Sequence, residues 1–354
     1  MTVTFILLLA GLAVHPILRS GNQTDGLTPP VSTFSIVASD SAAGGAGVAV
    51  ASRFFAVGSV VPWARAGAGA VATQSFCNTS FGWRGLDLLQ QGMTPEEALR
   101  VLLRNDPDPE QRQVGIVSAD GKSATHTGSK CIPWAGGRCG PSYAVQGNIL
   151  TGESVVIEME KAFLRSSGTL ADRLFAALSA GDRAGGDSRG RQSAALLVVK
   201  KNAGYGGFTD RAIDIRVDDH ADPFGELGRL LGIGQMNYAW NEAWTAFTQK
   251  EFVKALPLME RAARLGSANA EALYDLAVIR LAAGDPGGAI DAVRRAVMLN
   301  PKLRVQAMND NDLAGLRGRK EFEEIAAVLD HVIAGHRGQA PHVIALVDEI
   351  DPST

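Results

Sequence analysis

The chain has 354 residues, with 34 basic residues, 37 acidic residues and a formal net charge of −3. This length leaves room for two domains of ordinary size. The basic residues are scattered and form no Lys/Arg run, so no nucleic-acid partner is expected. A hydrophobic content of 46% excludes an intrinsically disordered chain.

The first 20 residues, MTVTFILLLAGLAVHPILRS, carry an apolar stretch with no charge before Arg19. The stretch is short for a membrane span but suits the core of a signal peptide, although the usual positive charge before it is missing. We expect a signal peptide over 1–20, a linker over 21–32, export to the periplasm or the outside of the cell, and no stable membrane span. A misassigned start codon, an uncleaved anchor and a cytoplasmic location are the alternatives.

Short apolar runs alternate with two helical windows between Phe34 and about Arg216. Helices are expected over 83–105 and over 154–181, the latter interrupted at Gly168. Thr94 followed by Pro95 is typical of a helix beginning. The mixture predicts a layered α+β domain. The expected strands are 34–39, 47–52, 68–74, 113–119, 124–128, 142–148, 193–201 and 212–219.

After Gly234 the pattern becomes continuously helical and contains an internal repeat. Ala255 and Ala289 lie 34 residues apart, as do Ala262 and Ala296. This period, with small residues at close-packing positions, is typical of tetratricopeptide repeats. We therefore expect a helical domain over 236–335, followed by a tail over 336–354. Two repeats are few for a free-standing array, so this domain is expected to pack against the first domain or to cap a helix that follows NDLAGLRGRKEFEEI. It is also expected to bind a protein partner or to self-associate.

The motifs of common cofactor and metal chemistry are missing. The chain has no HExxH or GxxxxGK[ST] motif. The glycines of 67–72 resemble a dinucleotide fingerprint only superficially, because the residues of 62–65 interrupt the strand that should precede them. Cys77, Cys131 and Cys139 lack the spacing of zinc ligands. We expect no metal and no cofactor, and we leave open whether Cys131 pairs with Cys139.

Two segments place polar side chains at the ends of core strands. The loop GGDSRGRQ carries Asp187 and Arg191 directly before a buried strand, so these charges are expected to be paired or to line a cleft. Gln146 and Asn148 lie at the end of another strand, where side-chain amides can donate to a developing oxyanion. Both segments are therefore candidates for a functional site.

Eight stretches of the chain, in order, carry a family resemblance. They are STFSIVASD, GVAVASRF, VPWARAGAGAVATQSF, GLDLLQQG, GSKCIPWAG, VQGNIL, GGDSRGRQSAALLVV and IDIRVDDHADP. Together they resemble the bacterial domain-of-unknown-function family 1028 over about 33–231. The resemblance implies the four-layer αββα sandwich of the N-terminal-nucleophile hydrolases, here followed by an all-α tetratricopeptide-like region. Members of the family have no settled substrate.

The resemblance also implies a nucleophile. In hydrolases of this type, a Thr, Ser or Cys at the start of the first strand attacks an amide carbonyl, and its own α-amino group accepts the proton. Thr33 matches that position, and Ser35 is the second candidate because it lies on the same face of the strand. Freeing the amine of Thr33 requires a cut between Ser32 and Thr33.

Other site residues follow from the same resemblance. Arg65 matches the basic residue that lowers the pKa of the amine, with arginine in place of the usual lysine, and Arg53 is the alternative. Backbone N–H groups at the helix beginning near Asn78, together with Asn148, are expected to form the oxyanion hole. The residues expected to bind substrate are Asn78, Ser80, Gln146, Asp187 and Arg191.

The sequence therefore predicts a hydrolase of a small amide or peptide bond that uses an N-terminal threonine. The alternative is a non-catalytic member of the same fold that acts as a binding module, with the helical repeats docking a protein partner.

Overall fold

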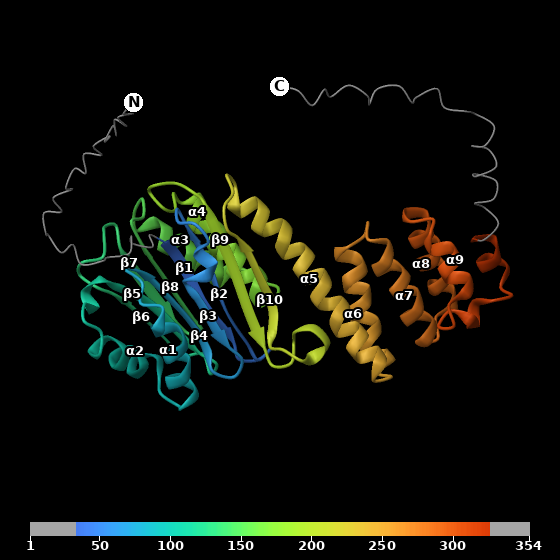
Figure 1. Ribbon diagram of the computed structural model, residues 1–354, viewed down its shortest axis with the longest axis horizontal. Coiled ribbons are helices and arrows are strands. Elements are labelled where there is room, and N and C mark those ends of the chain that lie inside the picture. Colours follow the sequence, from blue (N-terminus) through green and yellow to red (C-terminus); the bar gives the residue numbers. More distant parts are fainter. Residues whose placement is uncertain (1–32, 326–354) are drawn as a thin grey trace, which may run out of the picture.

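A computed structural model describes residues 33–325 and shows a mixed α+β domain followed by an all-helical region (Figure 1). The expected signal peptide, linker and tail lie outside the described residues, so export stays a prediction. Within residues 33–325, no helix is long and apolar enough to cross a membrane.

Two antiparallel sheets form the centre of the first domain. The six-stranded sheet contains, in spatial order, β10 (Arg211–Val217), β9 (Ser193–Lys200), β2 (Gly45–Ser52), β1 (Thr33–Asp40), β8 (Tyr143–Asn148) and β7 (Gly136–Gly140). The four-stranded sheet contains β3 (Pro62–Arg65), β4 (Gly69–Ser75), β5 (Arg112–Ser118) and β6 (Ser123–Thr127). The strands expected from the sequence all form. The sequence did not predict β3 and β7, which are short edge strands with little apolar alternation.

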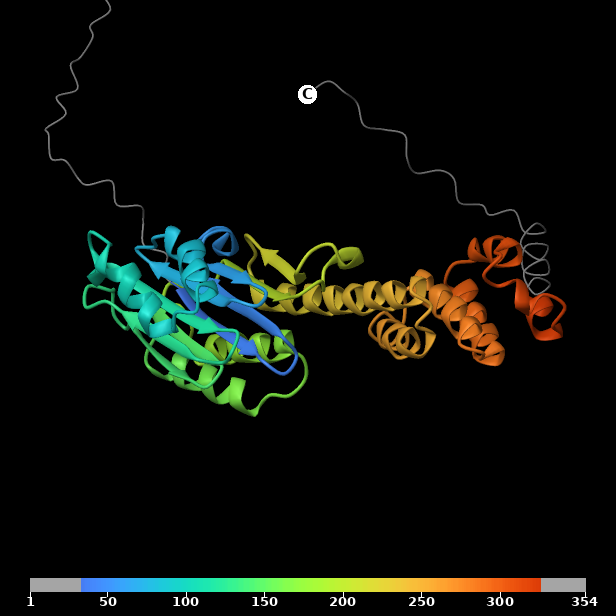
Figure 2. The same cartoon turned by 90° about the horizontal axis from the view of Figure 1, so that it is seen from below.

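Helices cover the outer faces of both sheets. The four-stranded sheet packs against α1 (Ser80–Gln90) and α2 (Pro95–Arg104). The six-stranded sheet packs against α3 (Ser154–Arg165), α4 (Leu170–Arg183) and the beginning of α5 (Pro223–Thr248). Figure 2 shows these two groups of helices on opposite sides of the strands.

Local signals explain where two of these helices begin. The hydroxyl of Thr94 accepts a hydrogen bond from the backbone N–H of Glu97, and Pro95 follows it, so α2 begins where the sequence predicts. Helices α3 and α4 are separated at Gly168, whose φ of 99° favours glycine. The interruption expected at Gly168 is therefore confirmed.

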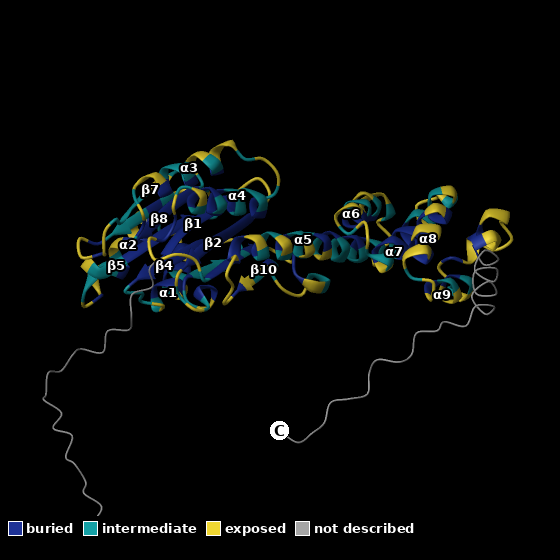
Figure 3. Cartoon of the chain, turned by 90° about the horizontal axis from the view of Figure 1, so that it is seen from above, coloured by how far each residue is buried: buried dark blue, intermediate teal, exposed yellow. Residues whose placement is uncertain are grey.

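The layers follow the order helix, sheet, sheet, helix. Along β1, Phe34 and Ile36 pack against the helices α3 to α5, whereas Val37 faces the four-stranded sheet, because neighbouring side chains alternate between the two faces of a strand. Val48 and Val117 join Val37 in filling one part of the space between the sheets. Figure 3 shows the sheets as the buried centre of the domain.

Helix α5 runs without a break from the first domain into the helical region, so the boundary expected near residue 235 falls inside a helix. Helix α5 packs against α6 (Phe252–Leu265), and α7 (Ala270–Ala282) packs against α8 (Pro286–Leu299), which α9 (Leu303–Asn309) follows. The paired helices are the arrangement that the repeat predicts.

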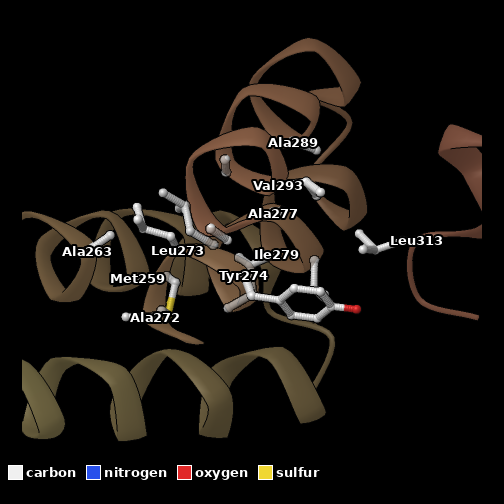
Figure 4. Close-up of a cluster of buried hydrophobic side chains, with 14 of the residues drawn as sticks. Met259, Ala263, Ala272, Leu273, Tyr274, Ala277, Ile279, Ala289, Val293 and Leu313 are labelled. Atoms are coloured by element: carbon white, nitrogen blue, oxygen red, sulfur yellow. The ribbon is translucent and has the colours of Figure 1, made fainter. Parts of the chain in front are cut away.

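The small residues of the repeat lie inside the helical region. Ala255, Ala262, Ala289 and Ala296 are each 0% exposed, which lets the helix backbones approach closely. Larger side chains belong to the same cluster, and Figure 4 shows Met259 of α6 near Leu273 of α7. The helical region therefore has a hydrophobic core of its own.

Candidate active site

Thr33, the first residue of β1, lies in a row of polar residues across the six-stranded sheet. Thr33 pairs with Asn148 of β8 on one side and with Ser52 of β2 on the other, and Ser52 pairs with Ser193 of β9. Directly opposite residues of antiparallel strands point to the same face, so the row faces the four-stranded sheet. Thr33 is 0% exposed, and its hydroxyl donates to Oγ of Ser52 over 3.3 Å.

Buried side-chain amides join this row to the four-stranded sheet. Nε2 of Gln74 donates to the backbone oxygen of Thr33 over 3.2 Å and to Oε1 of Gln113 over 2.8 Å. Oε1 of Gln113 also accepts from Nδ2 of Asn148 over 2.9 Å, and Nε2 of Gln113 donates to the backbone oxygen of Gly147 over 2.7 Å. The buried amide network therefore fixes the backbone at Thr33 and the strand beside it.

Ser35 and Gln146 belong to this network. The hydroxyl of Ser35 donates to Oε1 of Gln74 over 2.6 Å and accepts from Nε2 of Gln146 over 2.7 Å. Gln146 lies against Gly115, where an added Cβ would come within 2.1 Å of Oε1 of Gln146. The catalytic role expected for Ser35 and the substrate-binding role expected for Gln146 do not fit these positions, because both side chains are buried and hold the sheets together.

Arg53 follows Ser52 and lies at the same end of the sheet as Thr33. Its backbone N–H donates to Oδ2 of Asp187 over 2.9 Å, while its side chain is exposed. Arg189 approaches the buried Asp187 carboxylate with Nη2 at 2.9 Å from Oδ2 and with Nε at 3.1 Å from Oδ1. Asp187 therefore holds the end of β2, and with it Arg53, in place beside the polar row.

A small cavity of about 220 Å³ opens beside this end of the sheet. Phe34 and Ser52, both neighbours of Thr33, line it together with Asp187 and Arg191. The guanidinium of Arg191 is held by Asp182, with Nε at 2.6 Å from Oδ1 and Nη2 at 2.8 Å from Oδ2. Asp187 and Arg191 thus line the same cavity. Each is paired with another residue, Asp187 with Arg189 and Arg191 with Asp182.

Arg65 lies far from Thr33. It pairs with Gly69 at one end of β4, whereas Gln74, which contacts Thr33, lies five residues further along the same strand. At about 3.3 Å per residue, the two positions are roughly 17 Å apart. Nη1 of Arg65 contacts Oδ1 of Asp87 in α1 at 2.7 Å. The expected role of Arg65 beside the amine of Thr33 is therefore wrong, and Arg53 is the candidate that remains.

Asn78 and Ser80 lie at the beginning of α1. Oδ1 of Asn78 accepts from the backbone N–H of Ser80 over 3.1 Å and from its hydroxyl over 2.7 Å. Nδ2 of Asn78 donates to Oδ2 of Asp106 over 2.8 Å. These contacts stabilise the turn into α1, so both side chains already have a structural role.

The cysteines differ in their surroundings. Cys77, Cys131 and Cys139 are free thiols. Burial raises the pKa of Cys77 to about 11, while Cys139 is exposed on β7.

Sequence reasoning missed Gln74, Gln113, Ser52 and Ser193 as parts of the site. Gln113 shares its strand face with Val117, which is in the core, so the alternation of β5 already predicts that this glutamine points inward. Gln74 likewise shares a face with Ala72. A polar residue at a position that the alternation assigns to the core was therefore the signal that could have identified Gln74 and Gln113 as parts of the site.

Comparison with known proteins places this fold in a family. The chain belongs to the family of unknown function DUF1028, whose family model matches residues 33–227, and a tetratricopeptide-repeat model matches residues 246–308. A solved crystal structure of a DUF1028 protein from Silicibacter pomeroyi is similar, with 31% sequence identity and a TM-score of 0.52. The similarity covers 58% of this chain and 89% of the other. No curated protein matches the chain.

Proposed function

We propose that the first domain is a hydrolase of the N-terminal-nucleophile type that cleaves a small amide or peptide bond with Thr33. The observation that carries the proposal is the place of Thr33, the first residue of β1, which is a central strand of the six-stranded sheet. The four-stranded sheet packs on one face of this sheet and helices cover the other. Ser52 and Asn148 flank it in the polar row, and a cavity lined by Phe34 and Ser52 lies at the same end of the sheet.

The proposed chemistry begins with hydrolysis of the Ser32–Thr33 peptide bond, which consumes one water and frees the α-amino group of Thr33. That amine then accepts the hydroxyl proton as Oγ1 attacks the substrate carbonyl carbon. The α-ammonium then gives this proton to the leaving nitrogen, so the amine or ammonia of the substrate departs, and a second water hydrolyses the ester on Oγ1. Each turnover therefore consumes one water and needs no external cofactor.

The neighbouring residues take distinct roles in this proposal. The guanidinium of Arg53 lowers the pKa of the amine, because a nearby positive charge disfavours protonation. Asn148, whose amide Nδ2 lies in the polar row beside Thr33, is the side-chain donor of the oxyanion hole. Asp187 and Arg191 shape the cavity for substrate.

A panel of acyl p-nitroanilides tests the assignment on protein purified from its native compartment. Thr33→Ser should retain hydrolysis, Thr33→Ala should lose it, and Ser35→Ala should keep it if the domain remains folded. Hydrolysis that survives Thr33→Ala unchanged would rule out Thr33 as the nucleophile.

Export of the protein from the cytoplasm stays part of the proposal, with a cytoplasmic location as the alternative.

The second candidate is a non-catalytic binding module whose helical repeats dock a protein partner. The burial of Thr33 and the bond from its hydroxyl to Ser52 favour this candidate, because a nucleophile needs access to substrate. It requires an intact chain upstream of Thr33 and partner binding that depends only on residues beyond about 235. Loss of a partner on mutating Thr33 alone would count against it.

A further inference from the structure

A groove of about 720 Å³ lies outside the candidate active site, where the loop between β9 and β10 meets the helical region. Its walls come from the short 3-10 helix η3 (Tyr205–Gly207), from α5 and from α7. The groove is thus formed jointly by a loop of the first domain and by helices of the helical region. Its volume is in the range of ligand sites in proteins.

The loop holds two aromatic rings out in solvent. Tyr205 is 87% exposed and Phe208 is 90% exposed, and both line the groove. Asn241 of α5 anchors the loop, since its Oδ1 accepts from the N–H of Gly206 over 2.9 Å and its Nδ2 donates to the oxygen of Gly204 over 3.0 Å. The exposed rings are thus presented by an anchored loop, which is typical of a binding surface.

The floor of the groove carries a carboxylate between two indoles. Nε1 of Trp240 and Nε1 of Trp244 both donate to Oδ2 of Asp275, over 2.7 and 2.6 Å. Burial raises the pKa of Asp275, the hydrogen bonds from the two indoles lower it, and the nearby carboxylates of Glu271 and Asp310 raise it. The two indole N–H groups hold the carboxyl group in place, so an acidic group and aromatic rings meet at one point of the groove.

We propose that this groove binds a lysine or arginine side chain of an extended segment of a partner protein. The cationic head lies among the aromatic rings near Asp275, where cation–π attraction and the carboxylate act together. Polar side chains follow the same face of α5, from Asn237 to Thr248, and the hydroxyl oxygens of Thr245 and Thr248 can accept hydrogen bonds from a peptide backbone. This stripe is about 17 Å long, the length of about five extended residues.

This inference rests on the proposed docking role of the helical region and specifies a cationic side chain as the part of the partner that binds. It does not depend on whether the first domain is a hydrolase. Full-length protein is titrated with acetyl-Gly-Gly-Arg-Gly-Gly-amide and with the same peptide carrying citrulline, which is neutral and nearly isosteric with arginine. Calorimetry should show the arginine peptide binding at least about tenfold more tightly. Equal affinities, or no binding of either peptide, would overturn the proposal.

Variants test the position of the site. Tyr205→Ala combined with Phe208→Ala should weaken binding at least about fivefold without unfolding the protein, because both rings lie outside the core. Phe55→Ala, at a ring that is 63% exposed outside the groove, is the matched control and should bind normally. Asp275→Asn should reduce the preference for arginine over citrulline. Equal weakening by Phe55→Ala would show that binding is not in the groove.

Two further measurements separate this proposal from the others. Choline that binds as tightly as the arginine peptide would contradict a protein partner and assign the groove to small organic cations. The Thr33→Ala variant should bind the peptide normally, whatever happens to hydrolysis. A protein partner that binds the Tyr205/Phe208 variant as well as the wild type would refute the groove and leave the docking role standing.

Discussion

Thr33 and Ser52 lie directly opposite each other on β1 and β2, and the hydroxyl of Thr33 donates to that of Ser52 over 3.3 Å. The next residue after Ser52 is Arg53, whose backbone is tied to the buried carboxylate of Asp187. One pair of facing residues thus connects the proposed nucleophile to the positive charge proposed to tune its amine.

Replacing Arg53 tests that connection. Arg53→Ala removes a positive charge near the proposed amine, so the pKa of the amine should rise. The amine must be neutral to act as a base, so the acidic limb of the kcat/KM profile should move to higher pH, by about 0.5 to 1 unit. The profile is measured with the most active amide of the panel.

Arg65→Ala is the matched control for Arg53→Ala. Its ion pair with Asp87 is partly exposed, so its loss should cost less than about 1 kcal/mol of stability and leave the pH profile unchanged. An equal shift in both variants would point to a general charge effect and contradict the role of Arg53.

The buried amide network makes a prediction about stability. Gln113→Leu keeps most of the side-chain volume but leaves the bonding partners of Gln113 unsatisfied, including Gln74 and Asn148. The free energy of unfolding should fall by about 3 kcal/mol in urea denaturation followed by near-UV circular dichroism. The exposed Gln91→Leu serves as control and should change it by less than about 0.5 kcal/mol. A cost for Gln113→Leu as small as that of the control would mean that the network adds no stability.

Gly115 tests how closely the two sheets approach, and Gly232 in α5 serves as its control. Gly115→Ala brings a methyl group to 2.1 Å from Oε1 of Gln146, so it should destabilise the protein by about 2 kcal/mol. Gly232→Ala in α5 meets no atom within 4 Å and should stabilise it by about 0.5 to 1 kcal/mol through helix propensity. Thermal unfolding of both variants measures the difference, and the opposite order of stabilities would be inconsistent with this packing.

The thiols predict a difference in reactivity. Burial raises the pKa of Cys77 to about 11, so at pH 8 very little of it is the reactive thiolate. Iodoacetamide followed by peptide mass spectrometry should therefore modify the exposed Cys139 much faster than Cys77. Labelling of Cys77 should increase as the pH rises towards 11. Fast labelling of Cys77 at pH 8 would show that it is not buried in solution.

The sequence predicted the elements of the fold better than the geometry of the site. Apolar alternation located the buried strands, and the 34-residue period located Ala255 and Ala289 in the helical core. The edge strands β3 and β7 were missed because their glycines, proline and charges give no alternation. The local sequence pattern is sufficient to locate a strand or helix where one face is buried, because burial requires apolar residues at regular spacing.

The site depended on pairings that no local pattern reveals. Arg65 was assigned to Thr33 by its position along the chain, but the β3–β4 hairpin points it toward Asp87. Ser35 has the same alternation as Thr33, yet Gln74 and Gln146 occupy its hydroxyl. Which side chains meet between two sheets is set by register and sheet packing, and both require the three-dimensional structure.

The central claim, that Thr33 becomes an N-terminal nucleophile, is tested most directly by intact-mass and N-terminal sequence determination. Wild-type protein and the Thr33→Ala variant are purified from their native compartment under identical conditions. The account predicts a wild-type chain that begins TFSIVASD and a variant that keeps residues upstream of position 33. A wild-type chain that retains those residues, or a variant cut at the same bond, would contradict it.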